Sequence, residues 1–151
     1  MIALTQTHSA GFATWGEANA STEVPGNCLQ TAVASLLELP LDMVPHFAVF
    51  GNNWGGALTL WLSGRGARFV AYTDDPDTVA YFDYWSFESR PLGEAPADEL
   101  LIATGPSWNG PWGHVVLWQA GALVHDPHPS GRGIAGEPFE FWQITPEAVA
   151  A

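Results

Sequence analysis

The order of the hydrophobic patterns along the chain is the feature that most restricts its fold. Apolar residues recur every three or four positions over residues 28–38, which predicts an amphipathic helix that Asn27 caps and Pro40 ends. A second helix is predicted over residues 53–63, closed by Gly64. Strand-like segments dominate the rest of the chain. Helices first and strands later indicate an α+β domain with helices packed on an antiparallel β-sheet.

The predicted strands are short apolar runs separated by turn residues. They cover residues 67–73, 98–105, 113–126 as a hairpin, and 139–144, with a further short strand near residues 3–7 and a one-turn helix or turn over 41–47. The sequence shows no internal repeat and no linker. We therefore expect one domain over residues 1–151.

Charge excludes several classes of function. The chain has 4 Lys+Arg against 16 Asp+Glu, a formal net charge of -12, and every basic residue is an arginine. Binding to nucleic acid requires many cations, so it is not expected. Schiff-base and P-loop chemistry both need a lysine, so they are excluded. The acidity either favours a basic partner or only keeps the protein soluble.

The cysteine count and the N-terminal residues indicate the cellular compartment in which we expect the protein. A single cysteine forms no internal disulfide, so folding needs no oxidising compartment. The first residues lack the basic and apolar regions of a secretion signal, and no apolar run approaches the ~20 residues of a membrane span. We expect a soluble cytoplasmic protein without a cofactor.

The only cysteine, Cys28, lies where a loop becomes a helix. The unpaired N–H groups and the helix dipole at a first turn stabilise a thiolate, which is the nucleophilic form of the side chain. A small buried apolar residue is the alternative role of a lone cysteine. A neighbouring base is needed to favour catalysis.

The predicted hairpin supplies a candidate base. A three-residue loop over residues 119–121, with its last glycine in the left-handed conformation, places His114 opposite Asp126 on one face of the sheet. Val116 and Val124 share that face and would form an apolar floor. A two-residue loop would put the two polar side chains on opposite faces, because side chains alternate along a strand.

Three motifs together resemble those of a known family: "GNC" at a helix start, "GHVV" in a strand and "VHDPHPSG" at a strand end. The chain resembles the papain-like cysteine peptidase superfamily from residue 4 to residue 131. The nearest likenesses are C39-like bacteriocin-processing peptidases and small papain-like proteins encoded by bacteriophages. The resemblance implies that Cys28 is the nucleophile, His114 the general base and acid, and Asp126 the residue that orients His114.

The residue that would donate a hydrogen bond to the oxyanion of the reaction is not at the position where the family usually has it. Papain-like enzymes usually carry a glutamine a few residues before the cysteine, whereas this chain has Glu23 nearby and Gln6 as its only upstream glutamine. The strand expected at residues 3–7 could bring Gln6 beside the helix start, because a longer loop adds little closure entropy. Asn27 and Gln30 are alternatives, although Gln30 points away from the thiol. We expect Gln6 and the Cys28 N–H to be the donors.

The Gly/Pro-rich loop "TGPSWNGPWGH" leads directly into His114 and carries Trp108 and Trp112. These two indoles, with Asn27, are candidates for binding the substrate. A loop folded onto its own aromatic side chains is the alternative.

The "HDPH" segment also admits a metal site, because His125, Asp126 and His128 with His114 include acceptable zinc ligands. Strand alternation turns His125 away from His114, and two prolines restrict the backbone. We therefore expect no metal.

These observations predict a cysteine hydrolase, a peptidase or amidase, acting through an acyl-thioester on a peptide or protein substrate. The same site could perform transglutaminase-type acyl transfer or deamidation. A non-catalytic binding module of papain-like fold is the third alternative, and the retention of Cys28, His114 and Asp126 argues against it.

Overall fold

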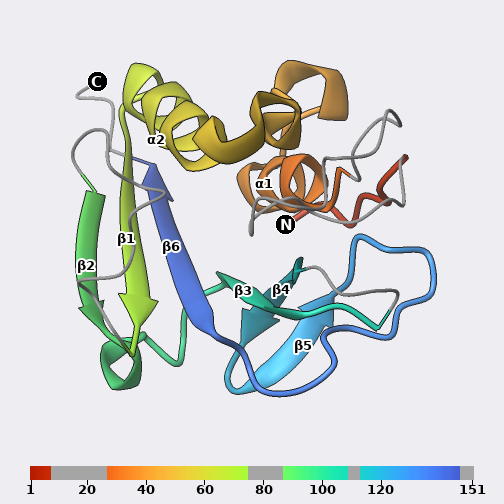
Figure 1. Ribbon diagram of the computed structural model, residues 1–151, viewed down its shortest axis with the longest axis vertical. Helices are drawn as coiled ribbons and strands as arrows, with labels where there is room; N and C mark the ends of the chain where they lie inside the picture. Colours follow the sequence, from red (N-terminus) through yellow and green to blue (C-terminus); the bar gives the residue numbers. More distant parts are fainter. Residues whose placement is uncertain (8–26, 75–86, 109–112, 147–151) are drawn as a thin grey trace.

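The elements of the computed structural model follow the predicted order, and residues 1–7, 27–74, 87–108 and 113–146 are described (Figure 1). Helices α1 (Cys28–Leu37) and α2 (Trp54–Gly64) come first, with the short 3-10 helices η2 (Leu41–Met43) and η3 (Phe47–Asn53) between them. The strands are β1 (Ala67–Thr73), β2 (Phe87–Pro91), β3 (Leu101–Pro106), β4 (Gly113–Gln119), β5 (Ala122–His125) and β6 (Glu140–Pro146), with η6 (Leu92–Glu94) after β2.

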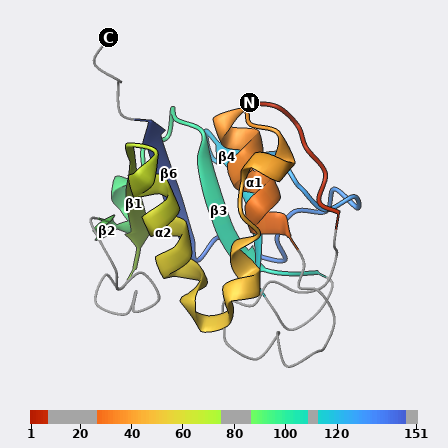
Figure 2. The ribbon, with the colours of Figure 1, turned by 90° about the horizontal axis from the view of Figure 1, so that it is seen from above.

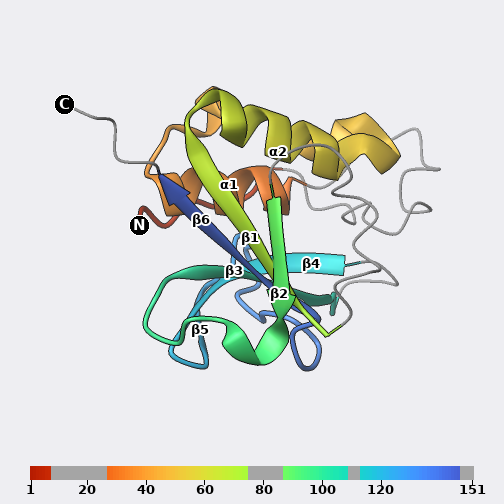
Figure 3. The ribbon, with the colours of Figure 1, turned by 90° about the vertical axis from the view of Figure 1, so that its left-hand side faces the viewer.

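The strands form one six-stranded sheet in the order β2-β1-β6-β3-β4-β5. Both helices cover the same face, with α1 over β4 and α2 over β1 (Figures 2 and 3). The α+β prediction is confirmed, but the purely antiparallel sheet is wrong because β1 and β2 run parallel. A parallel pair needs a crossover of about a dozen residues, and the chain between Thr73 and Phe87 is long enough for one.

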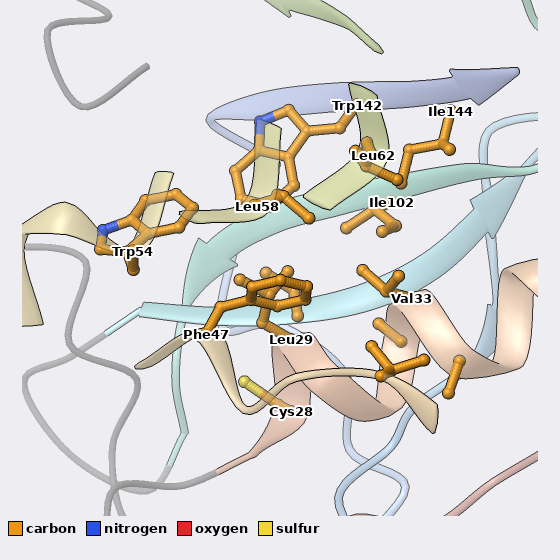
Figure 4. Packing of buried hydrophobic residues seen from close by; sticks show 14 of the residues in the cluster. Cys28, Leu29, Val33, Phe47, Trp54, Leu58, Leu62, Ile102, Trp142 and Ile144 are labelled. Atoms are coloured by element: carbon orange, nitrogen blue, oxygen red, sulfur yellow. The ribbon is translucent and has the colours of Figure 1, made fainter. Parts of the chain in front are cut away.

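The main core fills the space between the helices and the sheet (Figure 4). Leu29 and Val33 of α1 and Leu58 of α2 are at most 1% exposed. They meet buried side chains of the sheet, among them Ile102 and Trp142. Burying one such side chain contributes about 1.5–3 kcal/mol, so this packing holds α1 against β4. The helix start, and with it Cys28, is thereby placed at the edge of the core.

Helix α1 begins at Cys28 as predicted, but the Asn27 side chain does not cap it. The Asn27 Oδ1 accepts the Thr7 N–H at 2.9 Å instead, while the Asn27 carbonyl accepts both the N–H and the hydroxyl of Thr31. Glu38 ends α1 in the left-handed conformation, with φ of 57°. Among the described residues no single helix has the length and apolarity to cross a bilayer. Residues 28–37 and 41–50 reach that length and apolarity only when counted together, and the two segments are bent by 101°.

The N-terminal segment is irregular, so the strand predicted at residues 3–7 is wrong. Its backbone groups bond to scattered neighbours in place of a strand ladder. The Leu4 carbonyl accepts His125 Nε2 at 2.6 Å, and the Gln6 N–H donates to the Pro127 carbonyl at 2.8 Å. Together with the hydrogen bond from the Thr7 N–H to Asn27, these bonds connect residues 4–7 to the end of β5 and to the start of α1.

Candidate active site

The β4–β5 hairpin has a tighter turn than predicted. Gln119 pairs with Ala122, so the turn contains two residues, Ala120 and Gly121, with φ of 54° and 75°. Two consecutive positive φ values are typical of the two-residue turns whose twist suits a hairpin. The predicted left-handed glycine is confirmed, whereas the predicted three-residue loop is wrong.

A β-bulge corrects the register that this turn would impose. Trp118 pairs with Leu123, but the preceding residue, Leu117, pairs with His125, which leaves Val124 as an extra residue in β5. One extra residue exchanges the two faces of the strand beyond it. The bulge therefore returns Asp126 to the face of His114. Val124 itself is 43% exposed, so its predicted role in an apolar floor is wrong.

The structure brings His114 and Asp126 together as a buried pair. The His114 Nε2 lies 2.6 Å from the Asp126 Oδ1, and the two residues are 6% and 8% exposed. The Asp126 Oδ1 also accepts the His128 N–H at 2.9 Å, and its Oδ2 accepts the Gly133 N–H at 2.8 Å. Three donors thus hold this carboxylate, which fixes its position against the imidazole.

Cys28 is the third residue of the candidate site, near the buried pair of His114 and Asp126. Cys28 is 2% exposed at the first turn of α1, and it lies close enough to the His114 ring to contribute to the raised pKa of that imidazole. Since Nε2 is engaged by Asp126, Nδ1 is the ring nitrogen available to the sulfur.

Electrostatics favour a charged imidazole in this position. Burial disfavours the imidazolium and lowers the pKa, but the hydrogen bonds and charges of Asp126 and Cys28 outweigh burial and raise the pKa of His114 from 6.5 to about 10. For Asp126, burial raises the pKa, but bonds from His114 and from the His128 and Gly133 N–H groups hold it below its usual value. The site therefore combines a charged imidazole, a fixed carboxylate and a buried cysteine.

Gln6 is held near this group by its backbone. Its N–H bonds to Pro127, which follows Asp126, and the next residue, Thr7, bonds to Asn27, which precedes Cys28. Gln6 is 7% exposed. The alternative donor Gln30 is committed elsewhere, because its amide donates to the Leu41 and Val44 carbonyls of the η2 region.

An open cleft of about 550 Å³ adjoins the start of α1. It is lined by Thr7, Asn27, Gln30, Leu41, Asp42 and His46. Its volume lies in the range of ligand-binding clefts. Asn27, predicted to bind substrate, is therefore part of a cleft wall.

Trp108 follows β3 and is 50% exposed, with the Arg132 guanidinium 4.8 Å from its ring centroid. This exposed indole supports the predicted cleft wall more than a loop folded onto its own aromatics. Trp112 lies outside the described residues.

Two contacts of the site were missed in the sequence. The His128 ring packs edge-on against the His114 ring, with centroids 6.2 Å apart and planes at 86°. The backbone N–H of His128 donates to Asp126. An aspartate that accepts an N–H two residues later is a common turn, so "DPH" held this signal. The Gly133 contact could not be foreseen, because it depends on the path of the loop after β5.

The arrangement of these histidines bears on the metal alternative. His125 bonds to the Leu4 carbonyl and His128 Nδ1 to Ser130, so the two rings are engaged in different places. Within residues 1–7, 27–74, 87–108 and 113–146, no three His, Cys, Asp or Glu side chains are grouped to hold a metal ion.

The comparisons with known proteins add no identification: no protein-family model, curated protein or solved structure matches the chain. A buried thiol, an imidazole and a carboxylate in series are suited to nucleophilic catalysis with proton transfer.

Proposed function

We propose that the protein is a cysteine hydrolase that cleaves a peptide or related amide bond and has a papain-like fold. The single observation that carries this proposal is the buried His114–Asp126 pair with Cys28 beside it, near enough to raise the pKa of the imidazole. Burying a charged pair costs free energy, and a binding module has no need of one at this position. The N-terminal nucleophile helix packed on the sheet supports the fold assignment.

In the proposed reaction, the Cys28 sulfur attacks the substrate carbonyl carbon and the carbonyl π electrons move to the oxygen. The His114 imidazolium then gives its Nδ1 proton to the leaving amine as the C–N bond breaks and the thioester forms. Water attacks the thioester, His114 accepts its proton, and the C–S bond breaks to release the acid and the thiolate. Asp126 stays ionised and keeps the ring in position.

The oxyanion formed in each step needs donors close to the sulfur. We assign them to the Cys28 N–H, at the N-terminal end of α1, and to the Gln6 side chain. The bonds that tie residues 6 and 7 to Pro127 and Asn27 support Gln6, because they hold its backbone between the carboxylate and the nucleophile. Acyl transfer and deamidation share the thioester, and product analysis separates them from hydrolysis.

The test is the reactivity of Cys28 toward iodoacetamide, followed by intact mass. At pH 6 the folded protein should react at least tenfold faster than glutathione, because the adjacent imidazolium favours the thiolate. The His114→Ala variant should lose this advantage, and urea-denatured protein should react like glutathione. A native Cys28 that reacts only after denaturation would identify it as a core residue and end the enzyme proposal.

A further inference from the structure

The cleft beside α1 has a distinct pattern of donors and acceptors. The Asn27 amide donates to Thr7 Oγ1 at 2.9 Å and to Gln30 Oε1 at 3.2 Å. The Gln30 amide donates to the Leu41 carbonyl at 3.2 Å and the Val44 carbonyl at 2.8 Å. Each amide has two N–H groups, so the hydrogens of both side chains are already used. The amide floor of the cleft therefore offers little to an anion.

The charges of the cleft also favour a cation over an anion. Among the described residues that line the cleft, Asp42 is the only carboxylate and is exposed, and His46 is the only other ionisable side chain. The four arginines all lie elsewhere: Arg65 stacks on Trp61, Arg68 and Arg90 pair with Glu88, and Arg132 stacks on Trp108. With no lysine and a net charge of -12, the whole protein attracts cations.

The position of the cleft connects it to the candidate nucleophile. Two of its lining residues, Thr7 and Asn27, are the neighbours in sequence of Gln6 and Cys28. The Thr7 N–H bonds to the Asn27 side chain, so one hydrogen-bonded unit forms a wall of the cleft and supports both site residues. The cleft therefore borders the start of α1, the helix that carries Cys28.

We propose that the cleft is a specificity subsite that receives a basic side chain, lysine or arginine, of the substrate, with Asp42 as its charge partner. The proposal rests on the proposed function and names its substrate class as basic peptides. An acidic side chain would meet Asp42 without a compensating arginine. A neutral side chain of equal length would gain only the apolar contact with Leu41.

The experiment measures binding in the full-length Cys28→Ala variant, which cannot turn over. Acetyl-Ala-Lys-Ala-amide is titrated against the ¹⁵N-labelled protein, with the Asn27 and Gln30 side-chain amides as reporters. Matched titrations use the peptides with norleucine or glutamate in place of lysine. We expect saturable shifts for lysine with an affinity roughly fivefold above norleucine, the size of one partly screened ion pair, and the weakest binding for glutamate.

Variants separate the subsite from the general charge of the protein. Asp42→Asn should remove the fivefold preference, and Asp42→Lys should reverse it in favour of the glutamate peptide. Asp98→Asn makes the same charge change at an exposed residue of the β2–β3 connection and should change nothing. Equal binding of the three peptides, no saturable shift, or equal effects of the Asp42→Asn and Asp98→Asn changes would overturn the proposal. None of these results depends on Cys28 chemistry, so the hydrolase proposal stands or falls separately by iodoacetamide labelling.

Discussion

Replacing Asp126 by asparagine tests the central contact of the site with almost no change of shape. All three neighbours of the carboxylate are donors: His114 Nε2–H, the His128 N–H and the Gly133 N–H. Asparagine has one acceptor oxygen and an NH₂ group, so at least one neighbour must face another donor. If NH₂ faces Gly133, the loop after β5 is released. If NH₂ faces His114, it also faces the His128 backbone N–H, which loses its acceptor, and Nε2 must lose its proton, so the imidazolium is lost.

The size of the effect follows from the pKa of His114. A rise from 6.5 to about 10, at about 1.4 kcal/mol per unit, means that its surroundings favour the imidazolium by on the order of 5 kcal/mol. Part of this comes from Cys28, which the variant keeps. Removing one partner of a buried charge pair costs about 3–5 kcal/mol. We expect Asp126→Asn to lower the free energy of unfolding by about 3 kcal/mol and the melting temperature by roughly 10 °C.

The assay is urea unfolding of both proteins across pH, and the direction of each pKa shift sets the expected profile. Because the pKa of His114 is raised on folding, its stabilisation is complete below pH 6.5 and is lost as the pH rises through about 10. Because the pKa of Asp126 is lowered, its contribution is complete above pH 3.8 and is lost as the pH falls through the lowered value. The difference between the proteins should therefore be largest between about pH 4 and 6.5.

Two results would refute this reasoning. One is a variant as stable as the native protein at pH 6, which would mean that the pair contributes no net free energy. The other is a difference of constant size from pH 4 to pH 10, which would point to packing alone. The exposed Asp98→Asn change serves as the control and should leave the unfolding curve unmoved.

Further predictions concern rates and packing. In hydrolysis of a reporter peptide, we expect losses in the decreasing order Cys28→Ala, His114→Ala, Asp126→Asn, Gln6→Ala. Gln6→Ala should cost about 10²–10³ in rate as one of two oxyanion donors, and full activity would assign that role elsewhere. A Cβ at Gly105, the partner of His114 in β3, would lie 2.8 Å from Ile134 Cδ1, so Gly105→Ala should cost about 1–3 kcal/mol in thermal unfolding. Gly93→Ala meets open space and should be neutral, so equal melting of the two variants would contradict the contact.

Local patterns predicted most elements of the fold well. Helix α1 and strand β1 begin where the sequence indicates, because hydrophobic periodicity is a property of a few consecutive residues. The parallel pairing of β1 with β2 was missed, because it depends on the crossover between them. The irregular N-terminal segment was missed for a similar reason, since its partners lie at Asn27, Ser35 and Pro127.

The contact between His114 and Asp126 was predicted, but the geometry behind it was different. In the predicted hairpin the extra residue lies in the loop, whereas in the structure it is Val124, in a bulge of β5. Either position restores the same alternation, so the two polar groups meet in both cases. A bulge reflects tertiary contacts, such as the Gly133 bond to Asp126 and the close approach of Gly133 to Leu123, and no local pattern reveals these.

The residues of the site come from one hairpin, which carries His114 and Asp126, and from a helix far from it in sequence, which carries Cys28. The two parts therefore form at different times during folding. His114 and Asp126 are 12 residues apart in one hairpin, and hairpins form in about 1–10 μs. Cys28 belongs to a helix that must dock across a much longer stretch of chain, a slower step with a larger entropy of closure. During synthesis Cys28 also leaves the ribosome well before His114. A nascent or partly unfolded chain therefore carries an ordinary thiol, and the nucleophile matures only when α1 docks on the finished sheet.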